Sequence, residues 1–300
     1  MKPEKMTTKT QTLVVYPISS AVREAEMFLK QVESITTFND IQKKFIDEIH
    51  AYCKGDLSQI KEIESIADID NEKINMWLKE RGFQIKLEPF GPGGFGVASA
   101  LDLLGEWAIK GKNWSLQTED GEYYKGIKMN NYGKKFYRLK DNQNFIIEIE
   151  TRNGDLVYLL MADAVPAGLD LLDHIEYIQK EMEIAPFDYE GFIFPKIDLD
   201  EEIVLEWILN LRFETPRGVE PYYTIAQAIQ QTKLKMNEIG FRVKSAVAMG
   251  ILAGAAPKRT EPYVINRPFL MWIVRPGLSK PLFIAYLNKD VWKDPENLDM

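Results

Sequence analysis

The chain has very few cysteines and histidines, and this scarcity excludes several classes of protein. Cys53 is its one cysteine among 300 residues, so an intramolecular disulfide framework is excluded. The two histidines and this cysteine do not have the spacing of zinc ligands, and we expect no metal site. No apolar run approaches the ~20 residues of a membrane-spanning helix. The net charge of −8 disfavours nucleic acid or an anionic membrane as the main partner.

The N-terminus and the composition are those of an ordinary globular protein. Residues 1–6 are charged and lack the apolar stretch of a secretory signal, so we expect a cytoplasmic protein, although a mature secreted chain would look the same. Hydrophobic residues make up 45% of the chain and charged residues 27%, which allows a sizeable core. With no visible linker, we expect one domain over residues 1–300, helical over 1–82 and rich in sheet over 83–300.

The spacing of apolar residues predicts both helices and strands. Residues 13–16 read as a short strand ended by Pro17. Residues 145–149 and 156–161 flank Asn153-Gly154, a strong hairpin signal. The same patterns predict helices over residues 41–52, 68–82, 168–184 and 202–211 and a strand over residues 83–87. The mixture is typical of an α+β fold with extensive sheet.

Motifs that carry chemistry are scarce, and we expect neither an enzyme nor catalytic residues. His50 and Cys53 could share a helix face, but a nucleophile pair also needs an orienting group and an oxyanion hole. Gly91-Pro92-Gly93-Gly94-Phe95-Gly96 matches G-x-G-x-x-G literally, which makes a nucleotide-binding enzyme a distant alternative. Pro92 removes one of the backbone donors that such a site needs.

The most informative segment runs from residue 233 to residue 274. Its small-residue tract, 245–256, has no helical periodicity and lies between two strand-like runs. Loops of this length are usually functional or disordered, and this one is too apolar for a solvated disordered tail. The pattern indicates an exposed loop that a protein partner or a peptidase could bind.

Colinear motifs over most of the chain resemble those of the serpin superfamily. Their shared order makes the set specific, whereas any one match is weak. The sequence has Tyr16-Pro17-Ile18-Ser19 for Ser-Pro-x-Ser, Ile74-Asn75-Met76-Trp77-Leu78 for Ile-Asn-x-Trp-Val, Ser99-Ala100-Leu101 through Gly105-Glu106-Trp107 for Asn-Ala-x-Tyr-Phe-Lys-Gly-x-Trp, Phe194-Pro195-Lys196 for Leu-Pro-Lys, Asn237-Glu238-Ile239-Gly240 for Asn-Glu-x-Gly, and Asn266-Arg267-Pro268-Phe269-Leu270 for Asp-Arg-Pro-Phe-Leu.

The resemblance implies a serpin-like fold, in which helices cover a large, mostly antiparallel main sheet and a reactive-centre loop is exposed, here at about residues 240–266. In an inhibitory serpin this loop is cleaved by a peptidase and then inserts into the main sheet as a new strand. The resemblance assigns the loop hinge to Glu238, Gly240, Phe241, Val243 and Ser245. It assigns the region of the bait bond to Gly254, Ala255, Ala256, Pro257, Lys258 and Arg259, and the sheet-opening region to Ser19, Ser99, Trp107, Lys196 and Gln230.

Departures from the family pattern favour a loss of inhibition. Inhibitory serpins place Thr or Ser after the hinge glycine. Phe241 here is expected to overpack the narrow gap between strands when the loop begins to insert, at a cost of ~1–3 kcal/mol or more. Ser99 replaces an asparagine, and Gln230 stands where a histidine would partner it. Only about fifty residues separate Ser20 from Asn71, too few for the usual helices and the second strand of the sheet.

The sequence therefore predicts a reduced, divergent, non-inhibitory serpin-like protein that binds a protein partner. The alternative is a suicide inhibitor of a serine or cysteine peptidase that acts through the loop at 240–266. No cofactor, nucleic acid or membrane is expected as a partner, and a virus-encoded origin is conjecture.

Overall fold

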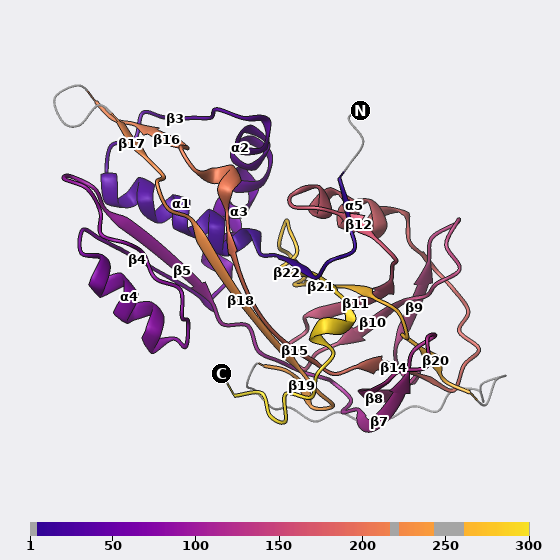
Figure 1. The fold of residues 1–300 in the computed structure, drawn as a ribbon. Helices are drawn as coiled ribbons and strands as arrows, with labels where there is room; N and C mark the ends of the chain where they lie inside the picture. Colours follow the sequence, from indigo (N-terminus) through magenta and orange to yellow (C-terminus); the bar gives the residue numbers. More distant parts are fainter. Residues whose placement is uncertain (1–4, 217–221, 243–260, 300) are drawn as a thin grey trace.

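The computed structural model describes residues 5–216, 222–242 and 261–299 (Figure 1). The largest sheet is antiparallel, with strand order β13-β9-β10-β11-β21-β22-β2. Its strands are β13 (Glu183–Ile184), β9 (Lys135–Arg138), β10 (Ile146–Glu150), β11 (Leu156–Met161), β21 (Phe269–Val274), β22 (Phe283–Leu287) and β2 (Gln11–Leu13). The chain is α+β, as the sequence predicts.

Two four-stranded sheets lie beside the largest one (Figure 1). One contains β20 (Tyr263–Val264), β14 (Gly191–Pro195), β8 (Tyr123–Asn130) and β7 (Lys112–Gln117), in that order. The other contains β15 (Ile197–Val204), β18 (Ile229–Met236), β19 (Gly240–Phe241) and β6 (Gly105–Glu106). Three smaller sheets pair β17 (Tyr222–Thr224) with β16 (Arg212–Glu214) and β3 (Ser34–Thr36), β4 (Ile63–Asp68) with β5 (Gly96–Leu101), and β1 (Met6–Thr7) with β12 (Val165–Pro166).

Helices lie mainly in the N-terminal part of the chain. They are α1 (Val15–Leu29), α2 (Asp40–Lys44), the π-helical turn η1 (Phe45–His50), α3 (Ala51–Asp56), α4 (Asn71–Glu80) and α5 (Asp170–Glu181), with short 3₁₀ turns η2 (Leu57–Gln59), η3 (Glu206–Ile208) and η4 (Lys289–Val291). Asp70 caps α4 by accepting a hydrogen bond from the Glu72 N–H at 3.0 Å. No helix within the described residues is long and apolar enough to cross a membrane.

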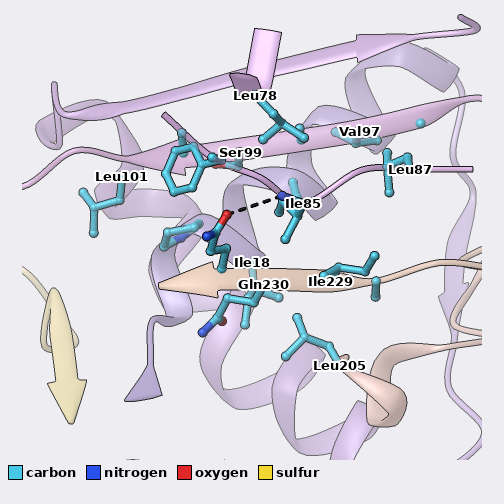
Figure 2. Close-up of a pocket in the computed structure, with 18 of the residues that line it drawn as sticks. Ile18, Leu78, Ile85, Leu87, Val97, Ser99, Leu101, Leu205, Ile229 and Gln230 are labelled. Atoms are coloured by element: carbon cyan, nitrogen blue, oxygen red, sulfur yellow. Dashed lines mark hydrogen bonds between the residues drawn. The ribbon is translucent and has the colours of Figure 1, made fainter. Parts of the chain in front are cut away.

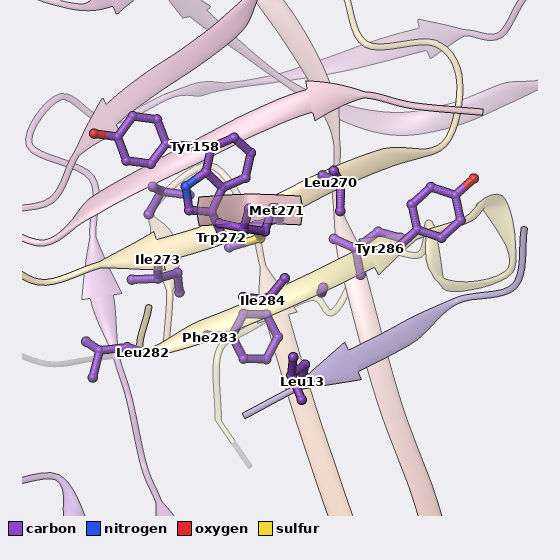
Figure 3. Close-up of a cluster of buried hydrophobic side chains, with 14 of the residues drawn as sticks. Leu13, Tyr158, Leu270, Met271, Trp272, Ile273, Leu282, Phe283, Ile284 and Tyr286 are labelled. Carbon is purple, nitrogen blue, oxygen red and sulfur yellow. The ribbon is translucent and has the colours of Figure 1, made fainter. Parts of the chain in front are cut away.

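The centre of the core lies on β11, β21 and β22 (Figure 3). Tyr158 stacks on Trp272 from the neighbouring strand, with ring centroids 5.1 Å apart. β21 and β22 are buried on both faces, which explains their nearly continuous apolar sequences. Gly154 turns the β10–β11 hairpin with a φ of +87°, so the hairpin prediction is confirmed.

The sheet of β4 and β5 is sandwiched between two helices. Ser20 of α1 hydrogen-bonds Ser65 of β4 at 2.7 Å, which places α1 on one face. Ile74 and Leu78 of α4 pack on Ala98 of β5, which places α4 on the other. This unit forms a wall of the site described below.

Three local predictions are wrong. Residues 14–16 are not a strand, because α1 begins at Val15 and carries Pro17 in its first turn, where a missing N–H breaks no helical bond. Residues 202–204 belong to β15, and only residues 206–208 form a 3₁₀ turn. Residues 83–87 join no strand ladder, because their backbone bonds to side chains instead.

Candidate functional site

The candidate site is the gap between β5 and β18. β5 pairs with β4 on its other edge, and β18 pairs with β15 along its whole length. On the side facing the gap, the one described strand pair of β18 joins Met236 to Phe241. A cavity of about 790 Å³ lies between the two strands. Figure 2 shows Val97, Ser99 and Leu101 on one wall and Ile229 and Gln230 on the other.

An extended segment, residues 83–90, covers this gap, and we call it the bridging segment (Figure 2). Towards α4, the Leu87 carbonyl accepts hydrogen bonds from the Asn71 and Asn75 amides, both at 3.0 Å. Towards β18, the Gln84 N–H donates to Gln231 Oε1 at 2.6 Å. The bridging segment therefore ties α4 to β18 across the gap.

A second glutamine of the β18 side holds the far end of the bridging segment. The Glu88 N–H donates to Gln227 Oε1 at 2.8 Å, and Gln227 Nε2 donates to the Glu88 carbonyl at 3.1 Å. Phe83, Ile85 and Phe90 pack against the cluster around Ile74 and Leu78. Side-chain amides and apolar contacts thus replace the strand ladder that the sequence predicts here.

The predicted hinge lies at one end of the gap. A tight turn at Asn237–Gly240 reverses the chain, and Phe241 then pairs with Gly105 of β6. The Phe241 ring is 1% exposed and lies edge-on to Trp107, with centroids 5.5 Å apart. A Cβ at Gly105 would lie 2.2 Å from Phe241 Cζ, so the glycine makes the space for the ring. The ring fits without a clash in this arrangement, and overpacking by Phe241 during loop insertion stays a prediction.

Trp107 and Gly240 fix the hinge turn. Trp107 is 1% exposed, and its indole N–H donates to the Asn237 carbonyl at 2.9 Å. A Cβ at Gly240 would lie 2.0 Å from the Gly105 carbonyl oxygen, so a side chain at Gly240 is excluded by the close approach of two backbones. Trp107 is therefore both a core anchor and a hydrogen-bond donor to the hinge.

A buried lysine ties the hinge to two other segments. Lys196 Nζ lies 3.0 Å from Glu238 and 3.0 Å from Asp294, and its side chain is 6% exposed. Burial opposes ionisation of Glu238, but its hydrogen bonds, including that from the Lys196 ammonium, outweigh burial and hold the Glu238 pKa below its ordinary value. Glu238 of the predicted hinge and Lys196 of the predicted sheet-opening region therefore form an ion pair.

This ion pair predicts an acid-dependent stability difference between the wild type and Lys196→Met. Folding lowers the pKa of Glu238. The stabilisation by ionised Glu238 is therefore present above about pH 4.3 and is lost as the pH falls through its pKa in the folded state. We expect Lys196→Met to lower the free energy of unfolding by about 1.5–3 kcal/mol near pH 7.

The difference should shrink below pH 4, as measured by urea unfolding at several pH values. Lys140→Met, at an exposed position, serves as the control and should change little. A difference that stays constant down to pH 3 would contradict the pairing argument.

The sheet-opening residues do not form one cluster. The Ser19 hydroxyl is 2.6 Å from Nδ1 of His50, and Ser19 does not line the cavity. Gln230 donates to Thr232 at 2.9 Å rather than to Ser99. The Ser99 hydroxyl is buried and has no hydrogen-bond partner among the described residues. The hydrogen bond between Ser19 and His50 was not predicted, because the two residues are far apart in the sequence and no local pattern indicates their contact.

Several predicted residues lie outside the described part of the chain. These are Val243 and Ser245 of the hinge and Gly254, Ala255, Ala256, Pro257, Lys258 and Arg259 of the bait region. Their roles stay predictions.

The alternative chemistries find little support in the geometry. Burial and the nearby Asp56 raise the pKa of the Cys53 thiol to about 12, which opposes a thiolate nucleophile. The glycines at 91–96 lead into β5 rather than into a helix, so the helix N-terminus that would hold a pyrophosphate is replaced by a strand. Among the described residues, no group of three potential metal ligands comes together.

Comparison with solved structures identifies the fold. The chain superposes on the mouse protein-Z dependent protease inhibitor with a TM-score of 0.58 and 12% identity, covering 94% of this chain and 91% of that one. It also matches thyroxine-binding globulin in complex with thyroxine (TM-score 0.53, 10% identity, 93% and 92% covered) and Serpin48 of the insect Tenebrio molitor (0.52, 9%, 94% and 92%). No family model and no curated protein matches the sequence. The chain therefore has the serpin fold, and the fold alone is what these identities establish.

Proposed function

We propose that this protein is a serpin-fold binding protein that holds a protein partner, and that its loop at 240–266 does not insert between β5 and β18. The observation that carries the proposal is the bridging segment, which joins α4 to β18 across the gap. An inserted strand would have to displace its bonds to Gln227 and Gln231 or pass beneath them. Either route slows insertion, and a trap works only if insertion is faster than release of the peptidase.

The alternation of side chains at the hinge supports the same conclusion. Phe241 points into the core, while Arg242 points to the other face and lies 3.5 Å from Asp102. In an inserted strand this alternation would carry Lys244 to the face of Arg242, towards the bridging segment. That face presents Ile85 and Leu87, and burying an unpaired ammonium there is costly.

Incubation with a panel of serine and cysteine peptidases tests the proposal. We expect cleavage of the loop without an SDS-stable complex at any ratio of peptidase to protein. A covalent complex that survives boiling in SDS would overturn the proposal.

Thermal unfolding of the cleaved protein gives an independent prediction. After cleavage at Lys258 or Arg259, confirmed by mass spectrometry, we expect the Tm to change by less than about 2 °C, which corresponds to ~1 kcal/mol. A strand inserted between β5 and β18 would raise the Tm much further. Lys244→Ala is the matched variant. A rise in Tm after cleavage that occurs only in this variant would identify Lys244 as the barrier to insertion of the loop.

The second candidate is a suicide inhibitor of a serine or cysteine peptidase. It is favoured by the facing edges of β5 and β18, which carry no further strand pairing among the described residues and could accept a new strand. It is also favoured by the name of the mouse neighbour, a protease inhibitor. The same two experiments decide between the candidates. In both cases the partner is a protein, and the expected site of action is the cytoplasm.

A further inference from the structure

We propose that the cavity between β5 and β18 binds a small, neutral, mainly aliphatic molecule that carries one hydroxyl or carbonyl group. The inference rests on the proposed function in one respect, because a loop inserted into the gap would fill the same space. It goes beyond that function in giving the gap a ligand of its own.

The size and the lining of the cavity support this inference. Its volume of about 790 Å³ lies in the range of small-molecule sites. The space is partly open to solvent and is large enough to admit a molecule much larger than water. Ile18 of α1 forms its floor, Leu205 and Ile229 one side, Val97 the other and Leu87 its cover (Figure 2). Small-molecule sites have such a mainly apolar lining with a few polar groups.

The charges around the cavity favour a neutral ligand. Arg81 pairs with Glu64, and Arg242 lies 3.5 Å from Asp102. Glu62 is bound by Arg275 at 2.7 Å. These partners compensate one another at the edge of the cavity, so a charged ligand would have to break an existing pair or be desolvated without a partner.

One polar group supports a hydroxyl or carbonyl on the ligand. Ser99 lines the cavity from β5, and its buried hydroxyl has no hydrogen-bond partner among the described residues. Buried hydroxyls are almost always hydrogen-bonded in folded proteins, and an exception requires an explanation. Because this oxygen has almost no accessible surface, the Ser99 side chain would rotate towards the cavity to bond a ligand oxygen, while the aliphatic remainder contacts Ile18 and Val97.

Displacement of the neutral fluorophore N-phenyl-1-naphthylamine by 1-alkanols tests this site. From 1-hexanol to 1-dodecanol we expect the affinity to rise about fourfold for each CH₂, the increment for burial of one methylene, until the cavity is filled. Ser99→Ala should weaken alkanol binding about two- to tenfold while leaving the increment for each CH₂ unchanged. Binding that does not depend on chain length would overturn the inference.

A filling variant and its control locate the ligand. Ala21→Phe places a ring into the cavity from α1 and should abolish binding, whereas Ala51→Phe, on an exposed part of α3, should not. Should Ala21→Phe fail to fold, crystals of the wild type soaked with 11-bromo-1-undecanol give the position directly. Bromine found away from Ile18 and Val97, or unchanged binding by a folded Ala21→Phe, would overturn the assignment.

A further arm separates the inference from the proposed function. Alkanol binding by the intact protein tests the cavity alone. Binding that is kept after cleavage of the loop supports both proposals, whereas binding by the intact protein that is lost after cleavage supports the cavity and contradicts a loop that does not insert.

Discussion

Replacement of Phe241 by alanine is expected to lower the free energy of unfolding by about 3–5 kcal/mol, the usual cost of removing a fully buried phenylalanine. The ring is 1% exposed and contacts Trp107, which in turn lies edge-on to Phe194 with centroids 6.1 Å apart. The loss should appear as a lower urea midpoint with an unchanged slope. Phe38→Ala, at a ring that is 55% exposed, is the matched control and should cost far less.

A double-mutant cycle with Gly105 tests why Phe241 fits. The three nearest atoms to a Cβ at Gly105 all belong to the Phe241 ring. Gly105→Ala should therefore destabilise the wild type by about 1–3 kcal/mol and the Phe241→Ala variant by much less. Equal costs in the two backgrounds would show that the ring does not occupy the space made by Gly105.

The fate of Phe241 shows what the sequence could and could not predict about the site. The motif at Asn237–Gly240 predicts a hinge after a strand, and the structure has a tight turn there that ends β18. The space for the ring depends on Gly105, which belongs to a distant strand and gives no local signal that it faces Phe241. Contacts between remote segments decide such packing, so the sequence alone does not show that the fold provides room for this ring.

The same limit explains the errors in secondary structure. The β10–β11 hairpin and α5 were predictable because turn chemistry and apolar spacing are local. Residues 83–87 of the bridging segment have a strand-like sequence, yet their backbone bonds to the side chains of Asn75 and Gln231. A pattern of apolar residues indicates which side chains are buried, but it does not indicate which groups form hydrogen bonds with their backbone.

Replacement of Arg275 by methionine is expected to cost about 3–5 kcal/mol, because it leaves a buried carboxylate without its partner. Arg275 Nε donates to Asp155 at 2.8 Å, and the Asp155 side chain is 1% exposed. Its two terminal nitrogens also donate to Glu62, at 2.7 and 3.0 Å. Since Glu62 lies just before β4, this arginine joins the β4–β5 wall of the gap to the end of β21.

Two controls separate charge burial from packing in this network. Arg152→Met removes a solvent-exposed pair with Glu106 and should cost less than about 1 kcal/mol. Adding Asp155→Leu to Arg275→Met should recover part of the lost stability, since it removes the uncompensated charge. If the double variant is as unstable as Arg275→Met alone, packing rather than charge accounts for the loss.

The pH dependence of the Arg275→Met effect follows from Glu62. Hydrogen bonds from Arg275 lower the Glu62 pKa in the folded protein, although burial opposes them. The stabilisation by ionised Glu62 is therefore present above about pH 4.3 and is lost as the pH falls through the pKa of Glu62 in the folded state. The difference in free energy of unfolding between the wild type and Arg275→Met should therefore decrease below pH 4, as measured by urea unfolding. Because the pair fixes one wall of the cavity, the same loss of charge should weaken alkanol binding by the wild type in acid. Alkanol affinity that is equal at pH 7 and pH 3.5 in a still-folded protein would show that the wall is held without this pair.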